Sequence, residues 1–193
     1  MKAVISRAFK ILVISFLLLF LKFIPAHATR LQDLSKKQLI GNSDSIIVGK
    51  VLEKYADWDP TGRYIYTYVR IQIVEDLKGA EGGEKEILVK QIGGRVGNRE
   101  MVMEGAPSFK VGEKTLVFLT SDPDGSKQVF GLVLGKFRII KDGFSGQERI
   151  FNPHNPKFFM NEGAAGGFAK TNSTSLDTLK GEIKEELDKT GSN

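Results

Sequence analysis

The sequence predicts a mainly β protein, in which about five or six antiparallel strands form a small, closed or nearly closed sheet flanked by two helices. Short apolar, β-branched segments recur between residues 45 and 151, and clusters of Gly, Pro, Asn and Asp separate them. No helical periodicity lies between these segments, which favours an antiparallel sheet over an α/β fold. The absence of an internal repeat of roughly 20 to 50 residues argues against a solenoid or propeller.

The first 28 residues have the three-part order of a secretory signal peptide. A basic start without Asp or Glu precedes an apolar run over residues 11–21, and the small-residue sequence Ala-His-Ala ends at Ala28. This run is about half the roughly 20 residues that a spanning helix needs, so cleavage between Ala28 and Thr29 is favoured over a retained membrane anchor. We therefore expect a mature protein in a periplasm or outside the cell. It has no cysteine to carry a lipid or form a disulfide.

The charge of the mature chain argues against nucleic-acid binding. The 193 residues have a formal charge of +5, but four of the 28 Lys and Arg residues lie in the first 28 positions. Removing that segment leaves 24 basic and 23 acidic residues. Nucleic-acid binding by counterion release requires a net basic footprint, which this balance does not supply.

The mature sequence begins with a predicted short helix over residues 30–40, where apolar residues recur at near-helical spacing and Gly41 follows as a stop signal. The first strand is predicted over residues 45–55. Gly49 lies in its interior, where a glycine indicates a bend or a bulge. A polar turn over residues 56–62 follows, punctuated by Asp-Pro and Thr-Gly.

The second strand is predicted within residues 63–79, where apolar and polar side chains alternate with the period of two that is typical of a half-buried strand. One side is a core face, and the other carries a ladder formed by Tyr64, Tyr66 and Tyr68. The pattern leaves open whether the ladder is exposed or lies under the C-terminal helix.

Later strands are predicted at residues 85–92, 115–120, 129–134, 136–141 and 148–151. Residues 121–127 form a hairpin signal, because Asp-Pro and Asp-Gly supply the turn dihedral angles. A capping box of Thr174 and Asp177, followed by an apolar stripe, predicts an amphipathic helix to about Lys189. These predictions give a sheet domain over residues 29–152, an irregular Gly-, Pro- and Asn-rich segment over 153–174, and a helix and tail over 175–193.

The mature chain lacks an obvious catalytic set. His154 is its only histidine, no cysteine accompanies it and no serine lies in a nucleophile elbow, so we favour a surface histidine. Asp57 and Asp59 flank Trp58, as an acid pair beside a sugar-stacking aromatic would. We favour the interpretation that this segment is a solvated turn. A glycan-binding site formed by these three residues is the alternative.

The sequence gives equally little indication of a metal site or a cofactor site. Asp57 and Asp59, together with Asp122 and Asp124, supply oxygen ligands but do not have the spacing of an EF-hand calcium loop. The glycines of residues 93–97 are not followed by a Lys-Ser pair and open no helix, so they do not indicate a phosphate loop. We expect no bound metal and no cofactor.

The segment over residues 93–108 is the main candidate for partner binding. It combines arginine, which is favoured at interfaces, with methionine, which adapts to varied partner shapes. Its apolar residues Val96, Val102 and Phe109 equally favour a lid or hairpin packed on the sheet, and the two interpretations are compatible. The candidate partner-binding residues are Arg95, Arg99, Met101 and Met103, with the ladder Tyr64, Tyr66 and Tyr68.

Four segments carry a family resemblance: SDSIIVGKVLE, YTYVRIQIVEDLKG, FKVGEKTLVFL and GLVLGKFRIIKDG. Their order resembles that of a group of uncharacterised exported bacterial proteins, between about Gly41 and Asp142. The same pattern is similar, more weakly, to netrin-like modules, which include the tissue inhibitors of metalloproteinases. That resemblance implies an OB-type five-stranded barrel with a helix on its side. Those inhibitors place an N-terminal cysteine at the protease zinc, and this chain has none, so no inhibitory site is transferred.

The sequence thus favours a secreted, non-enzymatic, OB-like module that binds a protein partner or a cell-envelope component. A glycan-binding or carbohydrate-active protein that uses Asp57, Trp58 and Asp59 is the first alternative. A protease-inhibitor-like module, suggested by the resemblance alone, is the second.

Overall fold

The computed structural model describes residues 34–79, 83–159 and 173–191, all within one compact unit, Gln32–Asn193. The predicted signal peptide and its cleavage point at Ala28 and Thr29 lie outside the described residues. So do the start of the first predicted helix and much of the irregular segment over 153–174.

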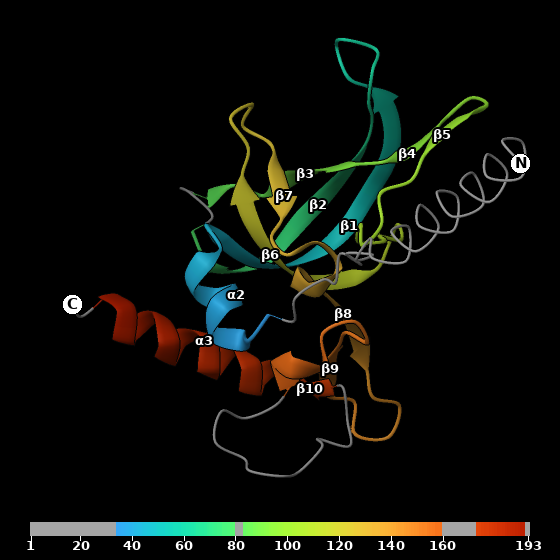
Figure 1. Ribbon diagram of the computed structural model, residues 1–193. Helices are drawn as coiled ribbons and strands as arrows, with labels where there is room; N and C mark the ends of the chain where they lie inside the picture. Colours follow the sequence, from blue (N-terminus) through green and yellow to red (C-terminus); the bar gives the residue numbers. More distant parts are fainter. Residues whose placement is uncertain (1–33, 80–82, 160–172, 192–193) are drawn as a thin grey trace, which may run out of the picture. The chain divides into compact units, whose positions relative to one another are not determined.

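The described part of the chain is mainly β, as predicted, with two α-helices and ten strands (Figure 1). The strands are β1 (Ser45–Trp58), β2 (Ile65–Lys78), β3 (Glu86–Ile92), β4 (Gly94–Val96), β5 (Arg99–Met101), β6 (Lys114–Ser121), β7 (Lys127–Val129), β8 (Lys136–Lys141), β9 (Glu148–Phe151) and β10 (Ser173–Ser175). The helices are α2 (Lys36–Asn42) and α3 (Leu176–Gly191), with the short 3₁₀ helices η2 (Leu132–Gly135) and η3 (Pro156–Phe159).

The main sheet is larger than predicted, and it is mixed. Eight strands follow the order β1-β2-β3-β7-β6-β8-β9-β10, β1 also pairs with β6, and β4 and β5 form a separate hairpin. The pairings therefore run from β1 through β2, β3, β7 and β6 back to β1. Alternating directions cannot close a circuit of five strands, so one neighbouring pair must be parallel. That pair is β3 and β7, joined only at Val89 and Lys127.

Strands β1 and β6 are buried on both sides, and each contributes to two hydrophobic cores. The strand core comprises Ile47, Val51, Val69, Ile71, Ile87, Val89, Phe109, Val117, Leu119 and Val129. The helix core comprises Leu39, Ile40, Ile46, Val48, Leu116, Phe118, Phe137, Ile139, Ile150, Phe158, Leu176, Leu179 and Ile183. Alternate residues of one strand enter different cores because successive side chains point to opposite faces.

The two helices close the helix core. Ser35 caps α2 in a capping box with Gln38. The helix was predicted to stop at Gly41, but it includes Gly41 and ends at Asn42. The apolar stripe predicted for the C-terminal helix is confirmed, with Leu176, Leu179 and Ile183 buried. That helix begins at Leu176, whereas Thr174 lies in the unpredicted strand β10.

The strand predicted over residues 129–134 was wrong. Strand β7 ends at Val129, and the chain turns through Gly131 and Leu132, both with positive φ, into η2. The side-chain amide of Asn152 donates to the carbonyls of Val133, Leu134 and Lys136. In a strand, these carbonyls would accept from the backbone N–H groups of a neighbouring strand.

Two further segments differ from the prediction. Residues 56–58, predicted as turn, extend β1 because they pair with residues 65–67 of β2. The glycine-rich stretch after β3 contains the β4–β5 hairpin, and the structure therefore confirms the hairpin alternative for this connection.

The bulge predicted at Gly49 is confirmed, since the register between β1 and β2 shifts between Val48 and Gly49. A Cβ atom on Gly49 would lie 2.3 Å from Cγ2 of Ile71 and 2.8 Å from the backbone oxygen of Gln72. The backbones of β1 and β2 thus approach too closely here for any side chain.

We expect Gly49→Ala to lower the free energy of unfolding by about 1–3 kcal/mol, because the added methyl group overpacks the β1–β2 contact. Urea denaturation measures the change. Gly41→Ala is the matched control, since nothing lies within 4 Å of its Cβ position in α2, and it should stabilise the chain by about 0.5–1 kcal/mol. Equal stability of Gly49→Ala and the wild type would contradict the close approach.

Candidate functional site

The predicted tyrosine ladder lies on the outward side of β1, β2 and β3. Tyr68 pairs with Tyr55 of β1 and with Lys90 of β3, and directly paired residues project to the same side of a sheet. The rings of Tyr55 and Tyr68 stack with centroids 5.2 Å apart, and the ammonium of Lys90 lies 4.7 Å from the centroid of the Tyr66 ring. We call this surface the tyrosine face and define it by Tyr55, Tyr64, Tyr66, Tyr68 and Lys90.

Tyr55 belongs to this face although the sequence pattern alone does not indicate it. The signal that identifies it is the register of the β1–β2 hairpin, in which Trp58 opposite Ile65 places Tyr55 opposite Tyr68. A prediction that ended the first strand at residue 55 could not align these two tyrosines.

Helix α3 does not cover the tyrosine face, which decides the alternative left open by the sequence, although Tyr66 and Tyr68 are half-buried. Helix α3 contacts the far end of β2, where Lys180 forms an ion pair with Glu75 and Leu77 packs against the helix core. At the other end of the strand Tyr64 is 48% exposed, and Tyr55 on β1 is 47% exposed. These rings are therefore available to a partner.

The cations of this surface are neutralised within the chain. Arg70 donates to Glu53 at 2.7 Å and lies 3.6 Å from Glu86. Lys90 donates to Asp124 of the β6–β7 turn at 2.5 Å. This hydrogen bond raises the pKa of Lys90 and lowers that of Asp124. The face consequently offers aromatic rings and paired charges, without an unpaired basic stripe.

The structure separates the residues of the glycan alternative. Trp58 pairs with Ile65, so it projects to the side of the hairpin opposite Asp57 and Tyr66. Asp59 folds the turn that follows, where its carboxylate accepts from the Thr61 hydroxyl at 2.5 Å and from the backbone nitrogens of residues 63 and 64. These bonds lower the pKa of Asp59 to about 2. Its carboxylate is therefore a turn-forming acceptor and not a proton donor at neutral pH.

The candidate arginines and methionines lie on and just after the β4–β5 hairpin. Arg95 and Arg99 are exposed, and Met101 is half-buried opposite Gly94. The base of the hairpin packs closely on the sheet, because a Cβ on Gly94 would lie 2.6 Å from Oγ1 of Thr67. Among the apolar residues expected to secure this connection, Phe109 is buried.

Val102 differs from that expectation, because it is 82% exposed. It directly follows the last residue of β5, where the hairpin ladder has ended and no paired strand covers it. Met103 beside it is 39% exposed. The hairpin is thus anchored at its base and presents apolar side chains to solvent where it ends.

A small cavity lies between β3 and β7. It has a volume of about 40 Å³ and is lined among others by Lys90, Ile92, Met103 and Leu132. Of the predicted partner-binding residues, Met103 alone lines it. Tyr66 and Tyr68 are paired with Ile92 and Lys90 on the neighbouring strand.

The weaker chemical candidates occupy ordinary positions. His154 is exposed, and its backbone nitrogen donates to the Asn152 side chain. Asp122 and Asp124 bind Lys90, Ser126 and Gln128. In the ranges that the structure describes, no three His, Cys, Asp or Glu side chains are grouped so that they could hold a metal ion. Of the described helices, none is long and apolar enough to cross a membrane.

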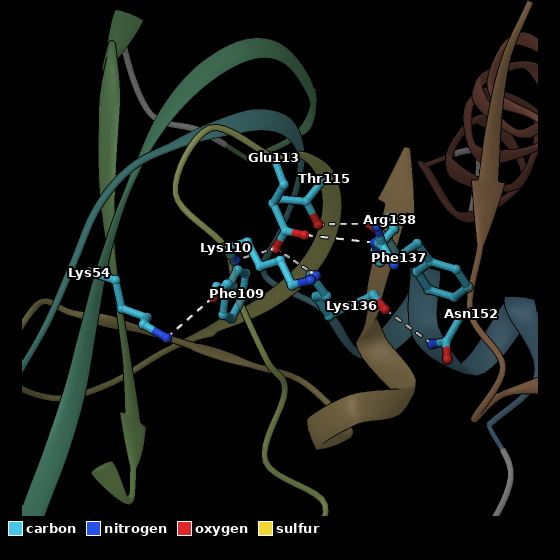
Figure 2. Close-up of polar contacts among 9 residues, drawn as sticks. All are labelled: Lys54, Phe109, Lys110, Glu113, Thr115, Lys136, Phe137, Arg138 and Asn152. Carbon is cyan, nitrogen blue, oxygen red and sulfur yellow. Dashed lines mark hydrogen bonds and ion pairs between the residues drawn. The ribbon is translucent and has the colours of Figure 1, made fainter. Parts of the chain in front are cut away.

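A buried ion pair is the second concentration of polar side chains (Figure 2). The Lys136 ammonium donates to Oε1 of Glu113 at 2.7 Å, and their side chains are 6% and 12% exposed. The same oxygen accepts from the backbone nitrogen of Lys110, and the Lys136 ammonium lies 5.1 Å from the centroid of the Phe109 ring. The segments FKVGEKTLVFL and GLVLGKFRIIKDG meet at this pair.

Burial lowers the pKa of Lys136, while the hydrogen bond and charge of Glu113 act in the opposite direction. A buried amine with a perturbed pKa is a candidate nucleophile, although structural ion pairs perturb pKa values in the same way. Here the ammonium is enclosed by Glu113 and Phe109 and has little exposure to solvent. We therefore interpret the pair as a link between β6 and β8.

A scan against protein-family models finds no match to this chain, and a search of curated proteins finds no significant relative.

We expect Glu113→Gln to lower the free energy of unfolding by about 3–5 kcal/mol, because it leaves the buried Lys136 ammonium without its charge partner. Lys136→Met should cost less, because Arg138 remains 3.9 Å from Oε2 of Glu113. The double variant should cost less than the sum of the two changes, as a double-mutant cycle in urea measures. Strict additivity would contradict a direct pair.

The pH dependence has a definite sign. The folded chain binds the Lys136 proton less tightly than the unfolded chain, so the free energy of unfolding rises as pH increases from the folded-state pKa toward the ordinary value near 10.5. Lys136→Met should abolish this component of the rise, and a Lys136 side-chain resonance that titrates above 10.5 would show that the direction is wrong.

Proposed function

We propose that the chain is a secreted, non-enzymatic binding module whose protein partner docks on the tyrosine face and the adjoining end of the β4–β5 hairpin. The observation that carries the proposal is the presence of exposed apolar and aromatic side chains on β1, next to the start of β2 and just after β5. Tyr55, Tyr64 and Met103 are each more than one-third exposed, and Val102 is almost entirely so. Tyr, Met and Arg are enriched at protein interfaces, where rigid aromatic anchors supply much of the affinity.

The arrangement of the turns supports the same surface. In Figure 1 the β1–β2 turn, the β4–β5 tip and the β6–β7 turn all project to the upper side of the view, away from α2 and α3. In an OB-type barrel, the face of the second and third strands and the turns beside it bind ligands. We infer such a barrel here from the circuit of five strands, β1-β2-β3-β7-β6, around the strand core.

The charges favour a protein over a nucleic acid. A polyanion gains affinity from unpaired cations, and on this face Arg70 and Lys90 already have carboxylate partners. A glycan needs aromatic platforms as well, and the Tyr55–Tyr68 stack is one. The separation of Trp58 and the turn contacts of Asp59 remove support for the glycan site as the sequence suggested it.

A non-enzymatic role is supported by the contacts of the titratable groups. Asp59 forms its turn, Asp124 binds Lys90, and Lys136 is enclosed with Glu113. Each of these groups with a shifted pKa therefore has a structural partner that accounts for the shift.

Secretion forms part of the proposal and has its own measurement. We expect the exported protein to begin at Thr29, and mass spectrometry of protein recovered outside the cytoplasm measures its N-terminus. A full-length chain starting at Met1, recovered with the membranes, would contradict cleavage between Ala28 and Thr29.

Photo-crosslinking tests the docking surface. We expect benzoylphenylalanine at Tyr55 or Tyr64 to crosslink one protein from an envelope extract of the source cell. Adding Tyr68→Ser to the Tyr64 bait should reduce the yield at least tenfold, because loss of an interface anchor typically costs about 2 kcal/mol or more.

The control bait carries benzoylphenylalanine at Phe144, a fully exposed aromatic residue in the β8–β9 turn. It should not capture that protein. The same product from all three baits, or no product from the tyrosine face, would contradict the proposal. Capture of glycan alone from the face would replace it with the glycan alternative.

A further inference from the structure

We infer that the open edge at the end of β1, from Lys54 to Trp58, receives an extended acidic segment of a protein, which adds to the sheet as a further strand. That this segment belongs to the partner on the tyrosine face rests on the proposed function. The edge and its charge rest on the observations that follow.

The first part of β1 lies between two strands, and the last part does not. Strand β6 pairs with β1 only as far as Lys50. The chain before β6 follows β1 slightly further, through backbone bonds between Val51 and residues 112 and 113. Beyond this point β1 continues to Trp58, and in the described part of the chain it is paired with β2 alone.

The register shows which backbone groups point to the open side. The Asp59 amide donates to the Tyr64 carbonyl, and successive residues of an antiparallel strand alternate between facing the partner strand and facing away from it. Counting back along β1 from Asp59, Lys54 and Ala56 face away from β2. On that side, no backbone bond from the described residues reaches either of them. An extended polypeptide supplies N–H and C=O groups that match such an edge.

The edge is also accessible. Lys54, Tyr55, Asp57 and Trp58 are exposed, and Ala56 is half-buried. The Trp58 amide already donates to Oδ1 of Asp57 at 2.7 Å, so the open amides are those of Lys54 and Ala56. Tyr55 lies between these two residues and belongs to the tyrosine face. A segment on this edge therefore lies directly beside that face.

The charge beside the edge selects an acidic segment. Lys54 pairs with Val69, so its side chain lies on the side of β1 opposite the tyrosine face. Its ammonium donates to the Phe109 carbonyl at 3.3 Å, which brings it toward the segment that contains Lys110 (Figure 2). A carbonyl is a neutral partner, so this contact leaves the charge of Lys54 uncompensated.

Glu113 does not neutralise these lysines, because other cations occupy its carboxylate. Oε1 of Glu113 accepts from Lys136 at 2.7 Å, and Arg138 lies 3.9 Å from Oε2. No ion pair of the described residues includes Lys54 or Lys110. The mature sequence as a whole has 24 basic and 23 acidic residues, so this excess is local. Carboxylates on an incoming segment would complement it.

A second copy of the chain fits this edge less well. An antiparallel pair of β1 strands would place Lys54 and Lys110 of both copies on the same side, where like charges disfavour pairing. The register shift between Val51 and Glu53 and the lysine at the edge are also devices that limit edge-to-edge self-association. The segment is therefore assigned to another protein.

Two blocked peptides test the edge on the purified chain. The acidic probe is acetyl-Thr-Val-Glu-Val-Glu-Val-Thr-amide, and the basic probe carries Lys in place of both Glu. In NMR titrations we expect the acidic probe to shift the amide resonances of Lys54 and Ala56, and to slow hydrogen exchange of the Ala56 amide about tenfold or more. Its affinity at low salt should be about threefold or more above that of the basic probe, as two exposed charge pairs imply.

Ala56→Pro is the decisive variant. Its ring replaces an N–H that points to the open side, so no β1–β2 bond is lost, and the fold should be retained while binding of the acidic probe is abolished. Ala56→Ser is the matched control, because it keeps the N–H at the same position and should bind as the wild type does. Lys54→Gln should remove most of the preference for the acidic probe, and it tests the charge independently of the proline.

Unchanged binding by Ala56→Pro would show that charge alone holds the probe, and strand addition would then be wrong. The absence of shifts at Lys54 and Ala56, or equal affinities for the two probes, would also overturn the inference. A free chain that sediments as a dimer, and that Ala56→Pro converts to a monomer, would assign the edge to a second copy instead. The titration needs no partner, so its failure and a failure of photo-crosslinking are separate results.

Discussion

Two-sided burial of β1 and β6 is the constraint on which the rest of the structure depends. Ile47 and Val51 of β1 enter the strand core, while Ile46 and Val48 enter the helix core. Strand β6 divides its side chains in the same way. Neither strand has a solvent face over these residues, so an unpaired polar group on either side would be buried. The Thr115 hydroxyl on β6 is paired, because it donates to the Phe137 carbonyl, whereas Oγ of Ser45 at the start of β1 is buried without a hydrogen-bond partner.

The same two-sided burial also determines which outward residues of β1 and β2 remain uncovered. The helices, β8 and β9 cover the outer side of β1 and β6, but they do not reach the tyrosine end of β1 and β2. That end extends beyond the helix core, so neither the helices nor β8 and β9 cover its outward residues. Because Tyr55 and Tyr68 lie on paired strands, the strand pairing fixes their backbone positions.

Sequence patterns predicted the parts of the fold that depend on local periodicity. The alternation in β2 was sufficient to place Val69 and Ile71 inside and the tyrosines outside. The continuous apolar runs of β1 and β6 predicted strands, but such a run does not identify which element covers its second face. The apolar residues after Val129 were wrongly predicted to form a strand, because an apolar run does not distinguish a strand from another buried element. Here Leu134 is buried from the 3₁₀ helix η2.

The candidate sites were predictable only to the level of residue type. Aromatic and methionine residues were recognised, but the position of Met103 at a cavity beside the tyrosine-bearing strand depends on the β2–β3 register and on the end of β7. The buried pair of Glu113 and Lys136 joins residues 23 positions apart, and no local pattern couples them.

The single parallel pairing has a consequence for how this architecture tolerates change. An odd circuit of antiparallel strands always contains one seam at which two neighbours run in the same direction, and here that seam carries one bridge. A seam with so little pairing can accept new loop residues without displacing a ladder of hydrogen bonds. Insertions can therefore be accommodated at this seam while β1 and β6 continue to hold both cores. In this sense the odd number of strands in the circuit determines where the sheet is most weakly paired and most tolerant of changes in length.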